Sequence, residues 1–285
     1  MNDSSTILVT GATGNIGRAL LPLLRQSGAN VLAGHRSGAN IDGAPGRAVD
    51  FTDRAGLEAA FQGVDTVFLL FPLLPNKREL AANAVAAARA AGVRHLVRSS
   101  GAGADTNAAA SLARLQGEID RAVIASGIPA TIVRPATFMQ NWVTYNAGMV
   151  KSGTVYLPLG EGRTAYVDVR DIAAAAAAIL RDPRPHAGAI YTVTGAEALS
   201  VGDVLAEIAR GAGRHATYVP VPDEAAIQAM KSMAMDDWTI DILMSLNRAA
   251  AAGETAGVTG DLQLLTHQAP RRFADFVRDH ADAWR

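Results

Sequence analysis

The chain contains no cysteine and only three lysines. Without cysteine, the protein has no disulfides, thiolate metal sites, iron–sulfur clusters or cysteine nucleophiles. Aromatic residues make up 5% and charged residues 19% of the sequence, and the formal net charge is -1. A net charge so close to zero gives no overall field for nucleic acid or an anionic membrane surface, so we expect neither as a partner.

Long apolar runs are missing as well. The longest, 172–180, is mostly alanine and is far shorter than the roughly 20 residues of a membrane span. The N-terminus leads directly into an apolar segment at 6–10 without the basic region of a signal peptide, so we expect a cytoplasmic protein. The histidines are scattered and no two are four residues apart, which excludes an HExxH site, and we expect no metal.

The remaining composition is that of a globular protein, with 49% apolar residues in a chain of 285. Short apolar runs without alternation predict strands at 7–10, 31–34, 48–49, 66–71, 96–97 and 131–133. Helix-like segments separate them at 16–26, 54–61, 79–91 and 111–125. This order predicts an α/β fold with a doubly wound parallel sheet of the Rossmann type.

The pattern changes after about residue 135. Strands are predicted at 154–157 and 191–193, and helices at 169–180, 201–209, 223–234, 237–252 and 270–281. We expect a dinucleotide-binding Rossmann domain over residues 1–150. A smaller α+β substrate lobe over 151–285 would pack on this domain, and further strands of the Rossmann sheet are allowed within this segment. Asp168 and Asp171 flank the start of the helix at 169–180, where capping and the helix dipole explain them without chemistry.

The most informative motif is a glycine-rich turn between the first strand and the first helix. Gly11 permits a tight turn out of the strand, Gly14 lets a pyrophosphate approach the backbone, and Gly17 lets the helix pack closely. Backbone N–H groups and the helix dipole then favour phosphate. The spacing is GxxGxxG, and its position predicts a dinucleotide site. The expected cofactor-binding residues of this turn are Gly11, Thr13, Gly14, Asn15, Ile16 and Gly17.

The end of the second strand indicates which dinucleotide is bound. A site for NAD(H) usually carries an acidic residue there to accept from the ribose 2′-hydroxyl. No acidic residue occurs between Ser4 and Ile41, and His35-Arg36 stands at the strand end. The planar guanidinium of Arg36 suits a 2′-phosphate, so we predict a preference for NADP(H), with NAD(H) also usable.

Motifs along nearly the whole chain resemble the atypical short-chain dehydrogenases/reductases, and among them the NmrA-like family. This resemblance implies NAD(P)H-dependent oxidoreductases, including flavin-independent quinone, azo-dye and triphenylmethane-dye reductases. The motifs that carry it are the glycine turn at 11–17, Asp50-Phe51-Thr52-Asp53, GVRHLV at 92–97 followed by Ser99-Ser100, SGIPATIVRP at 126–135 with Phe138-Met139-Gln140-Asn141, and VDVRDIA at 167–173.

The resemblance also implies cofactor contacts beyond the turn, at further strand ends. Such positions agree with the general rule that ligands of open α/β sheets bind beyond the carboxyl ends of the strands. The implied contacts are Asp50 and Phe51 at the adenine, Phe71 and Pro72 over the ribose and pyrophosphate, Ser99 and Ser100 near the nicotinamide, and Pro135 and Phe138 at the nicotinamide end.

The Tyr-x-x-x-Lys pair of typical superfamily members is absent. In that pair, the lysine lowers the pKa of the tyrosine, which transfers a proton. The lysines Lys77, Lys151 and Lys231 are preceded at four residues by Leu73, Ala147 and Ile227. This absence argues against the usual alcohol dehydrogenase and epimerase mechanisms.

We therefore predict a reductase whose acceptor needs mainly hydride, such as a quinone, an azo dye or a triarylmethane dye. Positioning a planar, electron-poor acceptor over the nicotinamide then carries the reaction. Four residues after the sixth predicted strand are expected to form an apolar acceptor platform. They are Phe138, Met139, Trp142 and Tyr145. These side chains are as readily explained as packing of the lobe.

Catalytic residues and the alternative function stay open. Ser100 and Tyr145 are weak candidates for a proton donor. Arg98 lies in a strand-like run, where alternation directs it away from Val97 and towards the surface or the second lobe, and we assign it no role. The alternative to an enzyme is a redox sensor that binds NADP(H) without turnover. The pattern favours neither a monomer nor a homodimer.

Overall fold

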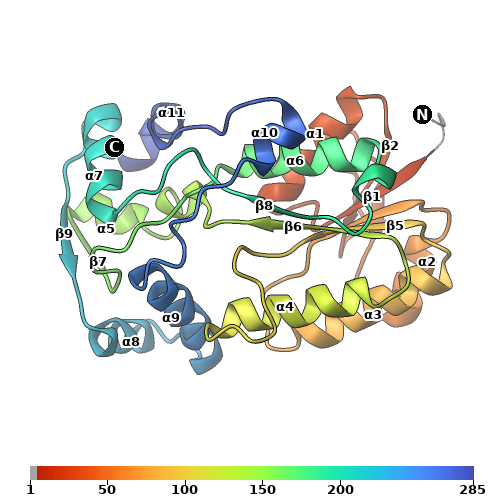
Figure 1. Cartoon of the computed structure of the whole chain (residues 1–285), viewed down its shortest axis with the longest axis horizontal. Helices are drawn as coiled ribbons and strands as arrows, with labels where there is room; N and C mark the ends of the chain where they lie inside the picture. Colours follow the sequence, from red (N-terminus) through yellow and green to blue (C-terminus); the bar gives the residue numbers. More distant parts are fainter. Residues whose placement is uncertain (1–4) are drawn as a thin grey trace.

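The computed structural model describes residues 5–285. Within them, the centre of the molecule is a seven-stranded parallel sheet in the order β3-β2-β1-β4-β5-β6-β8 (Figure 1). Its strands are β1 (Thr6–Thr10), β2 (Asn30–His35), β3 (Gly46–Ala48), β4 (Thr66–Leu69), β5 (His95–Ser99), β6 (Ala130–Pro135) and β8 (Ile190–Val193). The winding reverses between β1 and β4, which confirms the predicted doubly wound α/β fold.

Helices cover both faces of this sheet (Figure 1). They are α1 (Asn15–Gln26), α6 (Val169–Arg181) and α10 (Asp261–Thr266) on one face, and α2 (Arg54–Phe61), α3 (Lys77–Ala90) and α4 (Ser111–Ile124) on the other. The strands are apolar without alternation because both faces are buried. The alanine run of α6 packs against α1, where Ala173, Ala176 and Ala177 permit close approach.

The second lobe lies at one end of the molecule, where β7, β9, α5 and α7 gather (Figure 1). Its elements are η1 (Met139–Trp142), α5 (Ala147–Ser152), β7 (Thr154–Leu157), α7 (Val201–Ala212), β9 (Thr217–Pro220), α11 (Phe273–Asp279) and η3 (Ala281–Trp284). β7 and β9 form a two-stranded parallel sheet. Trp142, Phe273, Phe276 and Trp284 are buried in its core. The indole Nε1 of Trp284 donates to the Trp142 carbonyl at 2.9 Å, which fastens the C-terminus to η1.

Helices α8 (Asp223–Ser232) and α9 (Asp237–Ala251) follow β9 and pack on each other. α9 also lies against the start of α4 (Figure 1), where Ser245 Oγ accepts from the backbone N–H of Leu112 at 3.4 Å. The lobe therefore contacts the sheet domain through α9 as well as through the chain that leaves β6.

The main sheet draws residues from both sides of residue 150. Strand β8 pairs with β6 through Ile132 and Ile190, and η2 (Arg184–His186) precedes it. α6 and α10 also belong to the layer over the sheet. Two short helices, α5 and α10, and the four-residue strand β9 were not predicted, because segments so short show little periodicity.

The predicted fourth strand extended to residue 71, whereas β4 ends at Leu69. The side chain of Thr10 explains this early end. Its Oγ1 donates to the Phe68 carbonyl at 2.8 Å and accepts from the Leu70 N–H at 2.9 Å. These bonds draw the chain towards β1 and out of the sheet ladder. No helix among the described residues is long and apolar enough to cross a membrane.

Candidate functional site

The glycine-rich turn joins β1 to α1, and the backbone N–H groups of Thr13, Asn15 and Ile16 have no hydrogen-bond partner in the described residues. Gly11 has φ of +66°, a backbone conformation that favours glycine. The Gly14 N–H donates to the Gly11 carbonyl at 2.9 Å, which closes the turn. A Cβ on Gly17 would collide with the Gly11 carbonyl and with Ala12, so only glycine lets the helix approach the turn so closely. Thr13 and Gly14 are exposed.

Helix α1 begins without a competing anion. Gly14 is its N-cap and offers no side chain, and the first turn has no acidic residue. The first N–H groups of a helix have no partner within it, and its dipole favours negative charge there. Arg18 Nε donates to the Thr13 carbonyl at 2.8 Å, which places a cation beside the same turn.

The end of β2 carries Arg36 at the rim of a surface pocket of about 470 Å³. Arg47, Asp50 and Asp53 also line this pocket. Arg47 donates to two carbonyls at the end of α2, each at 2.9 Å. Arg36 is exposed and, within residues 5–285, takes part in no hydrogen bond or ion pair. Its guanidinium is therefore available to an anion.

Of the residues expected at the adenine, ribose and pyrophosphate, Asp50, Phe51 and Phe71 already contact other parts of the protein. Asp50 accepts from the backbone and the hydroxyl of Thr52 at 2.9 and 2.7 Å, and these bonds lower the pKa of its carboxyl, helped by the charge of Arg36. Phe51 and Phe71 are buried and pack edge to face, with ring centroids 5.0 Å apart. Their neighbour Pro72 is exposed.

Ser99, Ser100 and Pro135 lie at the ends of β5 and β6, beside each other at the same edge. The Ser100 N–H donates to the Val133 carbonyl at 2.7 Å, and the Pro135 carbonyl accepts from Ala102 N at 2.8 Å. The hydroxyl of Ser100 is buried and has no hydrogen-bond partner. A buried polar atom without a partner is uncommon and indicates a place for a ligand.

The four residues of the expected acceptor platform do not share one surface. Met139 and Trp142 are buried in the core of the second lobe. Phe138 is half-buried and packs against the core beneath α1 and α6. Tyr145 is 83% exposed. Burial follows from α7 and α11 closing over η1, a contact between segments that are far apart in the sequence.

Sequence reasoning misplaced Arg98. It is fully buried, not at the surface, because α4 covers that face of β5. Arg98 pairs with Asp120 and donates to Gln116 Oε1 at 2.6 Å, and Arg134 Nε donates to the same aspartate at 3.0 Å. The one signal in the sequence was a charged residue within an otherwise apolar strand.

The sequence pattern assigned Lys77 no role, because no tyrosine stands four residues before it to form a Tyr-x-x-x-Lys pair. It is 5% exposed and occupies the first inward position of α3, followed on the same stripe by Leu80 and Ala81. Burial lowers the pKa of Lys77 to about 7, and the charge of Arg98 acts in the same direction. Its place at the start of an apolar helical stripe is the feature that could have identified it.

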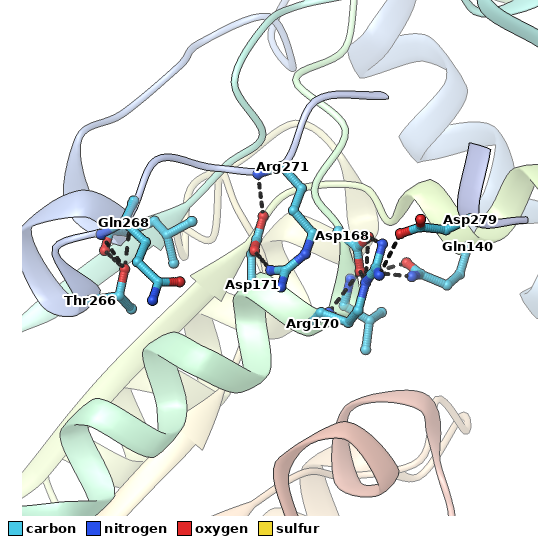
Figure 2. A network of polar contacts seen from close by, with 10 residues as sticks. Gln140, Asp168, Arg170, Asp171, Thr266, Gln268, Arg271 and Asp279 are labelled. Atoms are coloured by element: carbon cyan, nitrogen blue, oxygen red, sulfur yellow. Dashed lines mark hydrogen bonds and ion pairs between the residues drawn. The ribbon is translucent and has the colours of Figure 1, made fainter. Parts of the chain in front are cut away.

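A polar network joins α6 to the second lobe (Figure 2). Asp168 caps α6, as predicted, by accepting from Arg170 N at 2.8 Å, and the Arg170 guanidinium bridges Asp168 and Asp279 of α11. Gln140 donates to Asp168 Oδ1 at 3.1 Å. Burial raises the pKa of Asp168, but the bonds from Arg170 outweigh it and hold the pKa below its usual range.

Asp171 is bound differently, although it lies on the same helix. It accepts from the backbone N–H of Arg271 at 2.8 Å and pairs with the guanidinium of the same arginine (Figure 2). Here burial dominates and raises the pKa of Asp171 above its usual value. Together the two carboxylates attach the segment before α11 and α11 itself to the start of α6.

The residues at this edge fit a dinucleotide. The turn presents accessible N–H groups, a Cβ at Gly14 would occupy the approach beside Gly11, and the start of α1 is uncapped by any side chain. Arg36 adds an exposed guanidinium after β2, the strand end at which the adenosine ribose of a dinucleotide is expected. The described residues contain no group of three or more histidines and carboxylates that could hold a metal ion.

Comparison with known proteins gives matches over nearly the whole chain. A model of the NmrA-like family matches residues 3–260. The sequence is 38% identical over 283 residues to the NAD(P)H azoreductase of Xenophilus azovorans, which covers 98% of this chain and 99% of that protein. It is 36% identical over 284 residues to a (4-alkanoyl-5-oxo-2,5-dihydrofuran-3-yl)methyl phosphate reductase of Streptomyces griseus, with 98% and 99% covered.

Among solved structures, the NADPH-dependent quinone oxidoreductase of Escherichia coli complexed with NADPH superimposes with a TM-score of 0.87. The two chains are 26% identical, and the match covers 96% of this chain and 99% of the other. The similarity therefore includes the second lobe as well as the sheet.

Proposed function

The chain belongs to the NmrA-like family, and relatives named as an NAD(P)H azoreductase and a quinone oxidoreductase identify it as an NAD(P)H-dependent oxidoreductase. We propose that its acceptor is an aromatic, electron-poor compound. Quinones, azo dyes and triarylmethane dyes are the acceptor classes of this proposal. The observation that carries it is the identity of 38% to an NAD(P)H azoreductase over 98% of the chain. The uncapped glycine turn adds support from the site itself.

The cofactor would be held along the carboxyl edge of the sheet. The N–H groups of Thr13, Asn15 and Ile16 would bind the pyrophosphate, and Arg36 would bind a 2′-phosphate, which favours NADP(H) over NAD(H). Asp50 and Pro72 would border the adenosine half, and Ser99, Ser100 and Pro135 the nicotinamide half. A bound reduced nicotinamide supplies hydride, so this proposal needs no flavin.

The chain's own contribution is to position the acceptor and exclude water. The second lobe would cover the ends of β5 and β6, so that a planar acceptor is held between the lobe and the edge. The Streptomyces griseus relative acts, by its name, on an oxo-dihydrofuran phosphate. An electron-poor ring of this kind, like a quinone, accepts a hydride that a bound nicotinamide delivers in the right orientation.

The test is NADPH oxidation at 340 nm by the purified, flavin-free protein, with a panel of quinones, azo dyes and triarylmethane dyes. Turnover that depends on one of these acceptors supports the reductase and identifies its substrate class. NADPH binding detected by tryptophan quenching, with no turnover on any acceptor, would replace the proposal with a sensor that binds the cofactor without using it.

A further inference from the structure

Among the lysines within residues 5–285, Lys77 is the one that the fold buries. Helix α3 follows β4, so its first turn lies at the carboxyl edge of the sheet, where the cofactor site is proposed. Lys77 faces inward there and is 5% exposed. Lys151 and Lys231 lie exposed on α5 and α8. A lysine side chain is therefore buried next to the edge of the proposed site, on a helix that carries none of the motifs of the family.

The protein provides no partner for this ammonium. Among the described residues, no hydrogen bond or ion pair engages the side chain of Lys77, whereas Arg78 and Arg98 nearby are each paired with a carboxylate. A buried charge without a partner is costly unless a ligand completes it. The charged residues on the adjoining turns of α3 and α4 and on β5 are Arg78, which pairs with Glu118, Arg98, which pairs with Asp120, and the exposed Glu79.

Ser100 provides a second group without a partner at the same corner. It directly follows β5, which pairs with β4 in the sheet, and the helix that carries Lys77 follows β4. Its hydroxyl is buried and makes no hydrogen bond. Gln116, which binds Arg98, also passes 3.7 Å from the position of a Cβ on Gly101, so this cluster extends to the strand end.

From this placement we infer that Lys77 donates a proton to the acceptor of the proposed reduction, while the Ser100 hydroxyl holds the same acceptor atom. The inference rests on the proposed function. A quinone or azo compound that has received a hydride from reduced nicotinamide carries a negative charge on oxygen or nitrogen. An N–H bond of Lys77 breaks, an O–H or N–H bond forms on the acceptor, and the neutral amine regains a proton from water.

The acidity of the group suits this role. A general acid works best when its pKa is near the working pH. Burial lowers the pKa of Lys77 to about 7, and Arg98 contributes in the same direction. Since the protonated form is the donor, kcat is expected to be high below this pH and to fall as the pH rises through it.

The acceptors themselves provide the control for the first experiment. A triarylmethane dye is a carbocation that becomes neutral on taking up hydride and needs no proton, whereas quinones and azo dyes need one. Lys77→Met is expected to lower kcat with a quinone by about 10²-fold, and to abolish the loss of kcat above neutral pH. Its kcat with a triarylmethane dye should stay unchanged. The matched control is Lys151→Met.

Two results would overturn the inference. One is an equal loss with both classes of acceptor, which would make Lys77 a structural residue. The other is a quinone rate and pH profile in Lys77→Met that match those of the wild type. If the wild type does not reduce the triarylmethane dye, the test is whether Lys77→Met abolishes the fall of quinone kcat above neutral pH; a fall that remains would overturn the inference. Turnover of no acceptor by the wild type would instead defeat the proposed function.

A binding measurement tests the amine without turnover. 4-Nitrophenol resembles the reduced acceptor, and its phenolate form is yellow. With NADP⁺ present, the wild type should bind it as phenolate and raise the absorbance near neutral pH. Lys77→Met should weaken binding by about tenfold or more and remove the absorbance change, while Lys77→Arg retains both. An unchanged spectrum and affinity in Lys77→Met would contradict a role for the ammonium.

Discussion

Gln140 and Asp168 hold each other across the junction between η1 and α6. The Gln140 Nε2 donates to Asp168 Oδ1 at 3.1 Å, and its Oε1 accepts from the backbone N–H of Val169 at 3.1 Å (Figure 2). One amide thereby satisfies both a buried carboxylate and the first N–H of the helix. Because η1 continues into the second lobe and α6 lies on the sheet, this contact sets how the two parts meet.

Gln140→Leu is expected to destabilise the protein. The substitution leaves the Val169 N–H and one Asp168 oxygen without a partner, which costs about 1–3 kcal/mol. Thermal and denaturant unfolding would measure the loss. Gln263→Leu, on an exposed position of α10, is the matched control and should stay within about 0.5 kcal/mol of the wild type. Equal stability of Gln140→Leu and the wild type would show that the contact does not hold the junction.

Asp168→Asn should make stability less dependent on pH. The pKa of Asp168 is lowered in the folded state, so its contribution is present above the unfolded value of 3.8 and is lost as the pH falls through the folded value. The Tm difference between the wild type and Asp168→Asn is therefore expected to be largest near neutral pH and to shrink below about pH 4. Asparagine retains the N-cap, so the helix itself should persist.

Asp182→Asn provides the comparison for that profile, because Asp182 and its partner Arg184 are both exposed. Its Tm difference from the wild type should be small at every pH. A pH-independent difference in Asp168→Asn would mean that the carboxylate charge does not contribute and that only the shape of the side chain does.

Arg36→Ala tests the cofactor preference. Loss of a bond between Arg36 and a 2′-phosphate should weaken NADPH binding by about 1.5–3 kcal/mol and leave NADH binding unchanged. Dissociation constants for both cofactors, from tryptophan quenching, give the comparison. Arg89→Ala, on an exposed position at the far end of α3, should change neither. Equal weakening of NADPH and NADH in Arg36→Ala would remove the reason for preferring NADP(H).

Gly17→Ala tests the geometry of the turn. A Cβ at this position meets the Gly11 carbonyl and Ala12, so α1 must move away from the turn. Stability should fall by about 1–3 kcal/mol, and the dinucleotide should bind more weakly because the N–H groups move. Gly148→Ala, in α5 with open space around it, should instead be neutral or stabilise by up to about 1 kcal/mol. Unimpaired NADPH binding by Gly17→Ala would argue against this turn as the phosphate site.

Local patterns in the sequence were enough to predict the sheet and the turn. The spacing of Gly11, Gly14 and Gly17 encodes a conformation that only residues within one short segment create. The strands of the sheet are apolar runs whose burial on both faces follows from their own composition. The strand at Thr154–Leu157 and the helix that begins at Val169 were also predicted with their starting residues, since each has a clear boundary signal.

Contacts between segments far apart in the sequence decided which of the candidate side chains are buried. Alternation correctly separated Arg98 from Val97, but the covering of that face by α4 was not encoded near β5. The burial of Trp142 likewise depends on α11 and η3, which are more than a hundred residues further along the chain.

The sequence by itself determined that this protein has a dinucleotide-type turn on a doubly wound sheet, because those features arise from the order of residues along a few short segments. Only the tertiary structure decided that Lys77 is buried at the start of α3 and that the Ser100 hydroxyl is buried without a hydrogen-bond partner after β5. Their surroundings are assembled from α3, α4 and β5, and burial of a polar group is a property of everything that packs around it.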